Sequence, residues 1–332
     1  MIGSAAAGKD VSITGLGVKV PDRVMKNDEL SQFVDTSDEW IHARTGIRER
    51  RIASQEEALS DLALPAARDA LAQAGLDGKD VDLLIVATVT PDMTFPSTAA
   101  ILADALGASD AAAYDLSAGC TGFMYALAQA YGMLAGGLAH RALVGGDILS
   151  RLFDWTDRST LVLFGDGVGA VMLEAVPQQG FLGFDLGADG AGGESLWLPG
   201  SGSRVFEDAD RHIKMNGREV FKFATRILVQ SAEELLAKCQ VSIDDVDVYI
   251  PHQANVRIID HATKKLGIPS ERVVINVDRY GNTSSGSIPL AMADAVADGR
   301  LAPGKLVLMT GMGAGLTWGS ALMRWTMNGA AA

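Results

Sequence analysis

Short runs of apolar residues alternate with longer amphipathic stretches along the chain. Continuous apolar runs, such as residues 83–86 and 306–309, are typical of strands that are buried on both faces of a sheet. Residues 66–71 lie in a stretch whose pattern instead indicates a helix. The alternation of strands and helices predicts an α/β fold built in layers.

The chain also repeats itself at an offset of 165 positions. The strand predicted at residues 81–86 matches residues 246–250, and the helix that follows Cys120 matches the helix that follows Ser285. A repeat with one fixed offset decides the architecture of a fold. We therefore expect two halves related by a pseudo-twofold axis, in a layered α-β-α-β-α arrangement, with the site in the cleft where they meet.

The two halves are expected to cover residues 10–178 and 179–332, and no low-complexity linker separates them. Residues 1–9 are small and polar, without a long apolar core. They are interpreted as a flexible tail and not as a signal peptide.

Composition narrows the classes of function. The formal net charge of the 332 residues is −13, which argues against nucleic-acid binding because phosphates require a cationic surface. No run approaches the roughly 18 apolar residues of a membrane span. Two cysteines, Cys120 and Cys239, provide no disulfide framework, and free thiols favour a reducing, cytoplasmic location.

Cys120 is the candidate nucleophile. It lies in residues 114–123, YDLSAGCTGF, which indicate an apolar strand, a turn of small residues and the start of a helix. Unpaired N–H groups and the dipole at a helix N-terminus favour negative charge, so we expect a lowered thiol pKa and a thiolate able to attack a thioester. A lone cysteine is more often only a small buried apolar residue, and Cys239, which lacks this setting, is interpreted in that way.

The second half supplies two neutral hydrogen-bond donors. His252 follows a predicted strand in residues 251–255 (PHQAN), at the carboxyl edge where α/β sheets bind ligands. Asn282 lies in the glycine-rich turn of residues 280–286 (YGNTSSG), which the repeat brings to the same cleft. Such donors suit a carbonyl oxygen that gains negative charge. Taken singly, a lone histidine is usually structural and Asn-Thr-Ser is an ordinary helix cap.

Residues 311–319 (GMGAGLTWG) are expected to form a loop whose glycines let the backbone approach a ligand closely. The N–H groups of this loop, with that of Cys120, are candidates for an oxyanion hole. A glycine run is also typical of an ordinary turn.

Together these motifs resemble β-ketoacyl-acyl carrier protein synthase III, a condensing enzyme of the thiolase superfamily, over residues 10–325. The other matching motifs are residues 35–41 (DTSDEWI), 44–47 (RTGI) and 164–167 (FGDG). The resemblance implies a thiolase-like fold. It also implies an acyltransferase that joins an acyl-CoA primer to malonyl-acyl carrier protein with release of CO₂, the first condensation of fatty acid biosynthesis.

The resemblance also implies roles for single residues. Cys120 would carry the acyl group, while His252 and Asn282 would hold the thioester oxygen of the malonyl group during decarboxylation. Ala314 stands where the family often has a third consecutive glycine, and its backbone N–H would still complete the oxyanion hole with that of Cys120. The implied coenzyme A contacts are Thr36, Trp40, Arg44, Arg158, Phe221 and Asn255.

Phe95 would, by the same resemblance, reach the acyl pocket of a partner subunit, so a homodimer is expected. The family implies no cofactor and no metal, since coenzyme A thioesters are the substrates. A plainer interpretation of Thr36 and Glu39 is a capping box that starts a short helix.

Other functions remain to be weighed. A starter-unit synthase of a polyketide or alkylquinolone pathway would use the same three residues. A degradative thiolase needs a second cysteine near residues 311–319, which contain none, and elongating synthases have a second histidine where Asn282 stands. A non-catalytic scaffold has no need of all three site residues. The sequence leaves the primer open: acetyl, branched, longer or aryl.

A basic stripe is expected on this acidic protein. Arg257, His261, Lys264 and Lys265 recur at helical spacing on one predicted helix, and Lys222 is a further candidate. Clustered positive charge would steer an acidic acyl carrier protein to the site. Lys264 and Lys265 also fit a plainer role, in which they complement the helix C-terminus.

Overall fold

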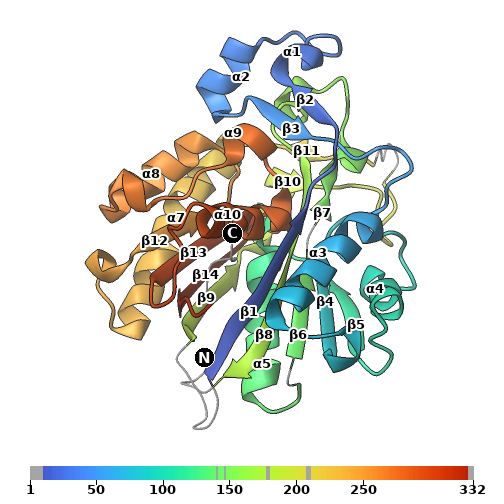
Figure 1. The fold of residues 1–332 in the computed structure, drawn as a ribbon. Helices are drawn as coiled ribbons and strands as arrows, with labels where there is room; N and C mark the ends of the chain where they lie inside the picture. The colour runs from blue at the N-terminus through green and yellow to red at the C-terminus, as the bar shows by residue number, and fades with distance from the viewer. Residues whose placement is uncertain (1–9, 140, 146, 177–179, 207–210, 328–332) are drawn as a thin grey trace.

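The computed structural model describes residues 10–139, 141–145, 147–176, 180–206 and 211–327 (Figure 1). The predicted tail and the predicted boundary between residues 178 and 179 lie outside the described residues.

The first half of the chain forms a sheet with the strand order β1-β8-β6-β4-β5. β4 pairs in parallel with β5 and β6, whereas β8 pairs antiparallel with β1 and β6. Helices α3 (Leu59–Ala74) and α4 (Thr98–Leu106) cover one face of this sheet. The strands are β1 (Asp10–Lys19), β4 (Leu83–Ala87), β5 (Ala112–Leu116), β6 (Arg141–Gly145) and β8 (Asp166–Val176), with the short β7 (Asp147–Ile148) paired to β8.

The second half forms a sheet with the order β12-β13-β14-β9. Its pairings are parallel, antiparallel and antiparallel, the same as in the series β4-β6-β8-β1 of the first sheet. Helices α7 (Gly217–Cys239) and α8 (Val256–Leu266) pack on its outer face. The strands are β9 (Phe181–Ala188), β12 (Val248–Pro251), β13 (Leu306–Gly313) and β14 (Thr317–Arg324).

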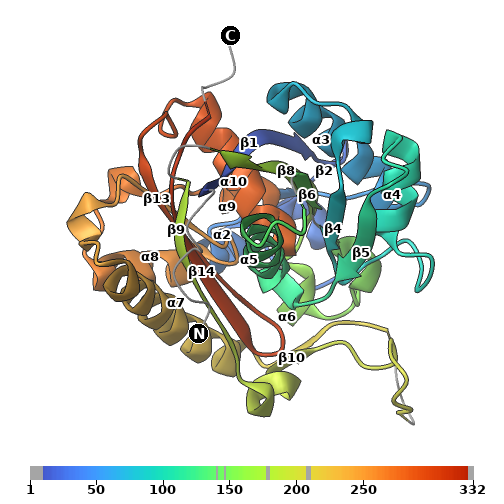
Figure 2. The ribbon, with the colours of Figure 1, turned by 90° about the horizontal axis from the view of Figure 1, so that it is seen from below.

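Helices α5 (Gly122–Ala135) and α10 (Ser287–Ala297) lie between the two sheets, as Figure 2 shows. Both are apolar on nearly all sides, which is typical of a helix that is buried rather than exposed on one face. Their first residues are 165 positions apart, as are those of β4 and β12. The predicted repeat and the layered α-β-α-β-α arrangement are thus confirmed.

A small cap lies over one end of the layers (Figure 1). The buried guanidinium of Arg50 anchors it, since this group donates to Asn27 Oδ1 at 2.8 Å and to the carbonyl of Val162 at 3.0 Å. The cap consists of β2 (Val24–Lys26), α1 (Asn27–Leu30), α2 (Asp38–Thr45) and β3 (Glu49–Arg51), near the short α6 (Arg158–Leu161), β10 (Leu196–Trp197), β11 (Lys214–Met215) and α9 (Val277–Tyr280).

Within the described part of the chain, no helix is both long and apolar enough to cross a bilayer.

Candidate active site

Cys120 lies in a short 3₁₀ turn, η2 (Gly119–Thr121), between β5 and α5, so the predicted strand, turn and helix are confirmed. Gly119 has φ +55°, and a Cβ there would lie 3.0 Å from the backbone N of Ala314. Only glycine tolerates this conformation without strain. The turn therefore packs directly against the hairpin of the second half.

The pKa of Cys120 moves in the direction opposite to the prediction. Burial raises the pKa of the thiol to about 11, while the Ser284 hydroxyl and the backbone of Cys120 itself oppose the rise only in part. The buried carboxylate of Asp147 raises the pKa further. The resting thiol is therefore protonated at neutral pH, so any attack by this sulfur requires the loss of its proton.

His252 follows β12 and is 2 % exposed. Its backbone N–H donates to the carbonyl of Thr310 at 2.7 Å, and its Nδ1 lies 2.6 Å from Ser287 Oγ. Burial lowers the pKa of the imidazole to about 4. The ring is therefore neutral at physiological pH, as a hydrogen-bond donor that does not release its proton should be.

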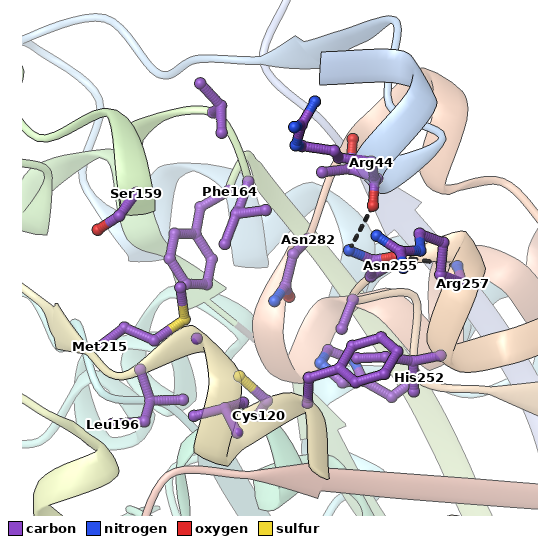
Figure 3. A pocket seen from close by; sticks show the side chains of 18 of the residues that line it. Arg44, Cys120, Ser159, Phe164, Leu196, Met215, His252, Asn255, Arg257 and Asn282 are labelled. Carbon is purple, nitrogen blue, oxygen red and sulfur yellow. Dashed lines mark hydrogen bonds between the residues drawn. The ribbon is translucent and has the colours of Figure 1, made fainter. Parts of the chain in front are cut away.

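Asn282 is fixed by three hydrogen bonds. Its backbone N–H donates to the carbonyl of Leu163 at 2.9 Å, and its carbonyl accepts from Gly165 N at 3.0 Å. Its side-chain Oδ1 accepts from the backbone N–H of Ser284 at 2.9 Å. Because Oδ1 is occupied, the donor Nδ2 is the end of the amide that faces the cavity. Figure 3 shows the Asn282 amide, the His252 ring and the Cys120 sulfur around the same space.

Residues 311–319 were expected to be a loop, and this prediction is wrong for most of them. β13 and β14 pair from Gly313 opposite Thr317 onward, so only residues 314–316 form the turn of a hairpin. A Cβ on Gly313 would lie 2.7 Å from the backbone N of Cys120, so this glycine serves close packing inside a strand. Thr317 Oγ1 lies 2.8 Å from the Ala314 carbonyl and 3.2 Å from the Ala118 carbonyl, which ties the two candidate oxyanion segments together.

The Cys120 thiol stands where two cavities meet. The larger, of about 250 Å³, is also lined by His252 and Asn282. The smaller, of about 90 Å³, is mainly apolar and also touches Gly119 and Ala314. The site thus places a candidate nucleophile between a cavity that also holds two hydrogen-bonding side chains, His252 and Asn282, and a smaller cavity lined almost wholly by apolar groups.

Basic and aromatic side chains line the outer part of the larger cavity. The guanidinium carbons of Arg44 and Arg158 lie 4.3 Å and 4.7 Å from the centre of the Trp40 ring. Phe221 and Asn255 line the same cavity. The amide of Asn255 is engaged at both ends, since Nδ2 donates to the Arg44 carbonyl at 3.0 Å and Oδ1 accepts from Arg257 N at 2.9 Å (Figure 3).

Thr36 is not among the residues that line this cavity. The capping box expected at Thr36 and Glu39 is wrong, because helix α2 is capped by Ser37, whose Oγ accepts from Trp40 N at 3.2 Å. The cap residue therefore lies one position further along the chain than the motif suggested.

The remaining predicted residues lie on the surface. Lys222 and the four members of the basic stripe are exposed, the latter on one side of α8. Arg257 also lines the larger cavity, and its guanidinium carbon lies 5.6 Å from the ring centre of Phe221. Phe95 is 83 % exposed, in the segment between β4 and α4.

Sequence reasoning missed several residues that hold the site together. Ser285 Oγ donates to the carboxylate of Asp147 at 2.7 Å or to the Ala87 carbonyl at 2.8 Å, which links the two halves beside Cys120. Ser287 contacts His252. In the sequence these serines look like ordinary residues at the start of a helix. The only signal that pointed to this turn was the offset of 165 positions, which aligns Ser285 with Cys120.

The described residues contain no group of three or more His, Cys, Asp or Glu side chains suited to a metal ion.

Comparisons with known proteins agree on one family. The family models described as 3-oxoacyl-[acyl-carrier-protein] synthase III and its C-terminal part match residues 114–190 and 236–325. The chain is 51% identical over 325 residues to β-ketoacyl-[acyl-carrier-protein] synthase III from Symbiobacterium thermophilum, covering 96% of this chain and 98% of that one.

A second relative with the same name, from Desulfitobacterium hafniense, is 50% identical and covers 96% of this chain and 99% of its own. Among solved structures, the same enzyme from Thermus thermophilus superposes with a TM-score of 0.91 at 48% identity, covering 96% of this chain and all of that one. A priming β-ketosynthase of a polyketide pathway superposes equally well, at 0.91, but is 35% identical.

Proposed function

The chain belongs to the β-ketoacyl-[acyl-carrier-protein] synthase III family, and on this premise we propose that Cys120, His252 and Asn282 carry out the initiating condensation of fatty acid synthesis. The substrates are an acyl-CoA primer and malonyl-acyl carrier protein. The observation that carries this proposal is the position of the Cys120 thiol, at the junction of an apolar cavity and a cavity that also holds two neutral donors.

The first half-reaction loads the primer. Cys120 sulfur attacks the thioester carbonyl of acyl-CoA, the backbone N–H groups of Cys120 and Ala314 stabilise the oxyanion, and coenzyme A leaves as the new thioester forms. The proton lost by the thiol is taken up by the departing coenzyme A sulfur. No net proton acceptor is needed, which suits a thiol whose pKa is raised by burial.

The second half-reaction forms the carbon–carbon bond. The malonyl thioester loses CO₂, and its carbonyl oxygen gains negative charge that His252 and Asn282 Nδ2 stabilise by hydrogen bonds. The resulting carbanion attacks the acyl-Cys120 carbonyl, and the Cys120 sulfur leaves as a thiolate that takes a proton from water. A charged imidazolium could return a proton to the carbanion, so the lowered pKa of His252 protects the intermediate.

Coenzyme A would enter through the larger cavity. Arg44, Arg158 and Arg257 give its lining positive charge, although the whole chain is acidic, and this favours the phosphates of coenzyme A. Arg158 rests on the Trp40 ring at 4.7 Å. An adenine that stacks between them requires Arg158 to swing away, and its hydrogen bond to the Asp35 carbonyl would break.

Primer length offers the test of this proposal. A cavity of about 150 Å³ holds benzene, so the apolar cavity of about 90 Å³ has room for roughly three or four carbons. Acetyl- to butyryl-CoA should acylate Cys120 at least tenfold faster than octanoyl-CoA, since a long chain needs the lining to move. Intact-mass spectrometry over a panel of acyl-CoAs measures both the adduct and its rate. Equal rates for octanoyl and acetyl would contradict this assignment, and no adduct with any primer would contradict the function itself.

The basic stripe on α8, together with Lys222, is the proposed docking surface for the acyl carrier protein. Reversal of charge in Lys222→Glu or Lys264→Glu should raise KM for malonyl-acyl carrier protein by about threefold or more, because exposed charges steer association. The effect should weaken as salt is added. Arg257 is less informative alone, since it also lines the coenzyme A cavity.

Arg68→Glu is the matched control for charge reversal. Arg68 is an exposed cation on α3, on the outer face of the opposite sheet. KM for the carrier protein should stay unchanged in this variant, and KM for acyl-CoA should stay unchanged in all three. If KM for the carrier protein is unchanged in both Lys222→Glu and Lys264→Glu, the docking surface is wrong and Lys264 only complements the helix C-terminus.

Other parts of the assembly belong to the same proposal. We expect a homodimer in which the exposed Phe95 reaches the partner's acyl pocket, a cytoplasmic location, and catalysis without metal or cofactor. A starter-unit synthase of a polyketide pathway is the second candidate. The higher identity to the fatty acid enzymes, 51% against 35%, favours the first.

A further inference from the structure

Ser287 is the buried partner of the His252 imidazole. It is the first residue of α10, is 1 % exposed, and its Oγ lies 2.6 Å from His252 Nδ1. The backbone N of Gln253 also reaches this hydroxyl, at 3.4 Å. The hydroxyl therefore lies between an amide that can only donate a hydrogen bond and a ring nitrogen that can either donate or accept one.

The direction of these hydrogen bonds can be worked out. The amide of Gln253 is a donor, so Ser287 Oγ accepts from it. The hydroxyl then has one proton to give, and Nδ1 is the only acceptor that the described residues bring within its reach. If Nδ1 carried the ring proton instead, the Ser287 proton would have no acceptor, a costly state for a buried group.

We propose that Ser287 is a positioning residue that holds His252 as the tautomer protonated at Nε2, so that the ring offers a donor to the malonyl thioester oxygen. In the opposite tautomer Nε2 would present a lone pair, which repels an oxygen that is gaining negative charge. The inference rests on the role proposed for His252 and extends it: the serine selects which ring nitrogen acts.

The repeat makes this serine specific to the second half. The position that corresponds to Ser287 in the first half is Gly122, the first residue of α5, because the two lie 165 positions apart. A Cβ on Gly122 would lie 3.2 Å from the Cβ of Ala87 and 3.7 Å from that of Ser285. A side chain at Gly122 would thus be tightly packed, and the first half carries no hydroxyl at this position, whereas the second half has one beside its histidine.

Nuclear magnetic resonance of the full chain with ¹⁵N-labelled histidine tests the tautomer directly. His252, assigned by its loss in His252→Ala, should show a protonated Nε2 and an unprotonated Nδ1 that accepts a hydrogen bond. In Ser287→Ala the signals should shift toward a mixture of tautomers. A protonated Nδ1 in the unmodified chain would overturn the proposal without any variant.

Kinetics separate a positioning role from a structural one. Ser287→Ala should slow decarboxylation of malonyl-acyl carrier protein by roughly tenfold, as is typical when the partner that orients a histidine is lost, and should leave acylation of Cys120 unchanged. Ser287→Thr, which keeps the hydroxyl, should restore part of the rate. Ser231→Ala is the control: this buried serine, 1 % exposed, binds Asp185 and Ser320 away from the site, and its loss should leave decarboxylation unchanged.

The outcomes distinguish this inference from the proposed function. If Ser287→Ala keeps the full decarboxylation rate while His252→Ala loses it, the tautomer proposal is wrong and the role of His252 stands. If His252→Ala also keeps the full rate, both fail. An equal loss of acylation and decarboxylation in Ser287→Ala would show a general structural defect and overturn the positioning role.

Discussion

Replacement of Cys120 by alanine is expected to abolish transfer of an acyl group from acyl-CoA to the protein. The variant lacks the sulfur that stands at the junction of the two cavities, and oxyanion stabilisation alone forms no covalent intermediate. The loss should therefore be complete, unlike the partial loss that follows removal of one hydrogen-bond donor. Intact-mass spectrometry after incubation with acetyl-CoA should show one added acetyl group on the unmodified chain and none on the variant.

Cys239→Ala is the matched control, because Cys239 is the other thiol of the chain. It lies at the end of α7, half-buried, and burial raises its pKa as well. The control should take up acetyl at the unmodified rate. An adduct that persists without Cys120 and disappears without Cys239 would move the nucleophile to the other half of the chain.

The raised pKa of Cys120 also determines how the reactivity of its thiol depends on pH. Below a pKa of about 11, the thiolate fraction grows tenfold with each pH unit. Alkylation of Cys120 by iodoacetamide should therefore accelerate steadily from pH 6 to pH 9, with no plateau. A plateau near pH 7 would show that the N-terminus of α5 lowers the pKa of Cys120 more than burial raises it.

The fold could be predicted from the sequence because its duplication is visible there. One offset of 165 positions aligns the starts of β4 with β12, of α5 with α10 and of β6 with β13. Two copies of one supersecondary pattern can bury their apolar faces only against each other, so the layers follow from the repeat. The cap and Arg50, which anchors it, lie outside the repeat. Nothing in the local pattern of apolar and polar residues indicated where the cap packs.

The hairpin of β13 and β14 shows where local reasoning failed. A run of glycines usually marks a turn, yet Gly313 and Gly319 are paired within strands. Glycine is needed at Gly313 because the backbone of Cys120 passes too close for a side chain. That contact joins residues almost two hundred positions apart, and a pattern of neighbouring residues contains no information about it.

The error in the pKa of Cys120 has a similar origin. The helix that begins at Gly122 could be predicted from the sequence, and with it the favourable effect on negative charge. The depth of burial could not, since the turn is covered by the hairpin of the other half and Asp147 lies near. The residue types of the site were thus predictable, whereas the energies that depend on what surrounds them were not.

Replacement of either donor should separate the two half-reactions. His252→Ala and Asn282→Ala are expected to accept an acetyl group at the normal rate, because neither side chain holds the thiol. Decarboxylation of malonyl-acyl carrier protein should fall by roughly 10²-fold or more in each, the usual cost of one lost donor at a developing oxyanion. Release of ¹⁴CO₂ from labelled malonyl-acyl carrier protein measures this step, and intact mass measures the first.

Asn282→Asp sharpens the test, because alanine would also leave the buried amide of Ser284 without the Oδ1 acceptor that it contacts at 2.9 Å. Aspartate keeps an acceptor at that position and removes only the donor, while it adds a negative charge beside the forming enolate. If donation to the malonyl oxygen is the role of Asn282, this variant must decarboxylate at least as slowly as Asn282→Ala. A variant in which aspartate restores decarboxylation would instead show that support of the Ser284 turn is what Asn282 provides.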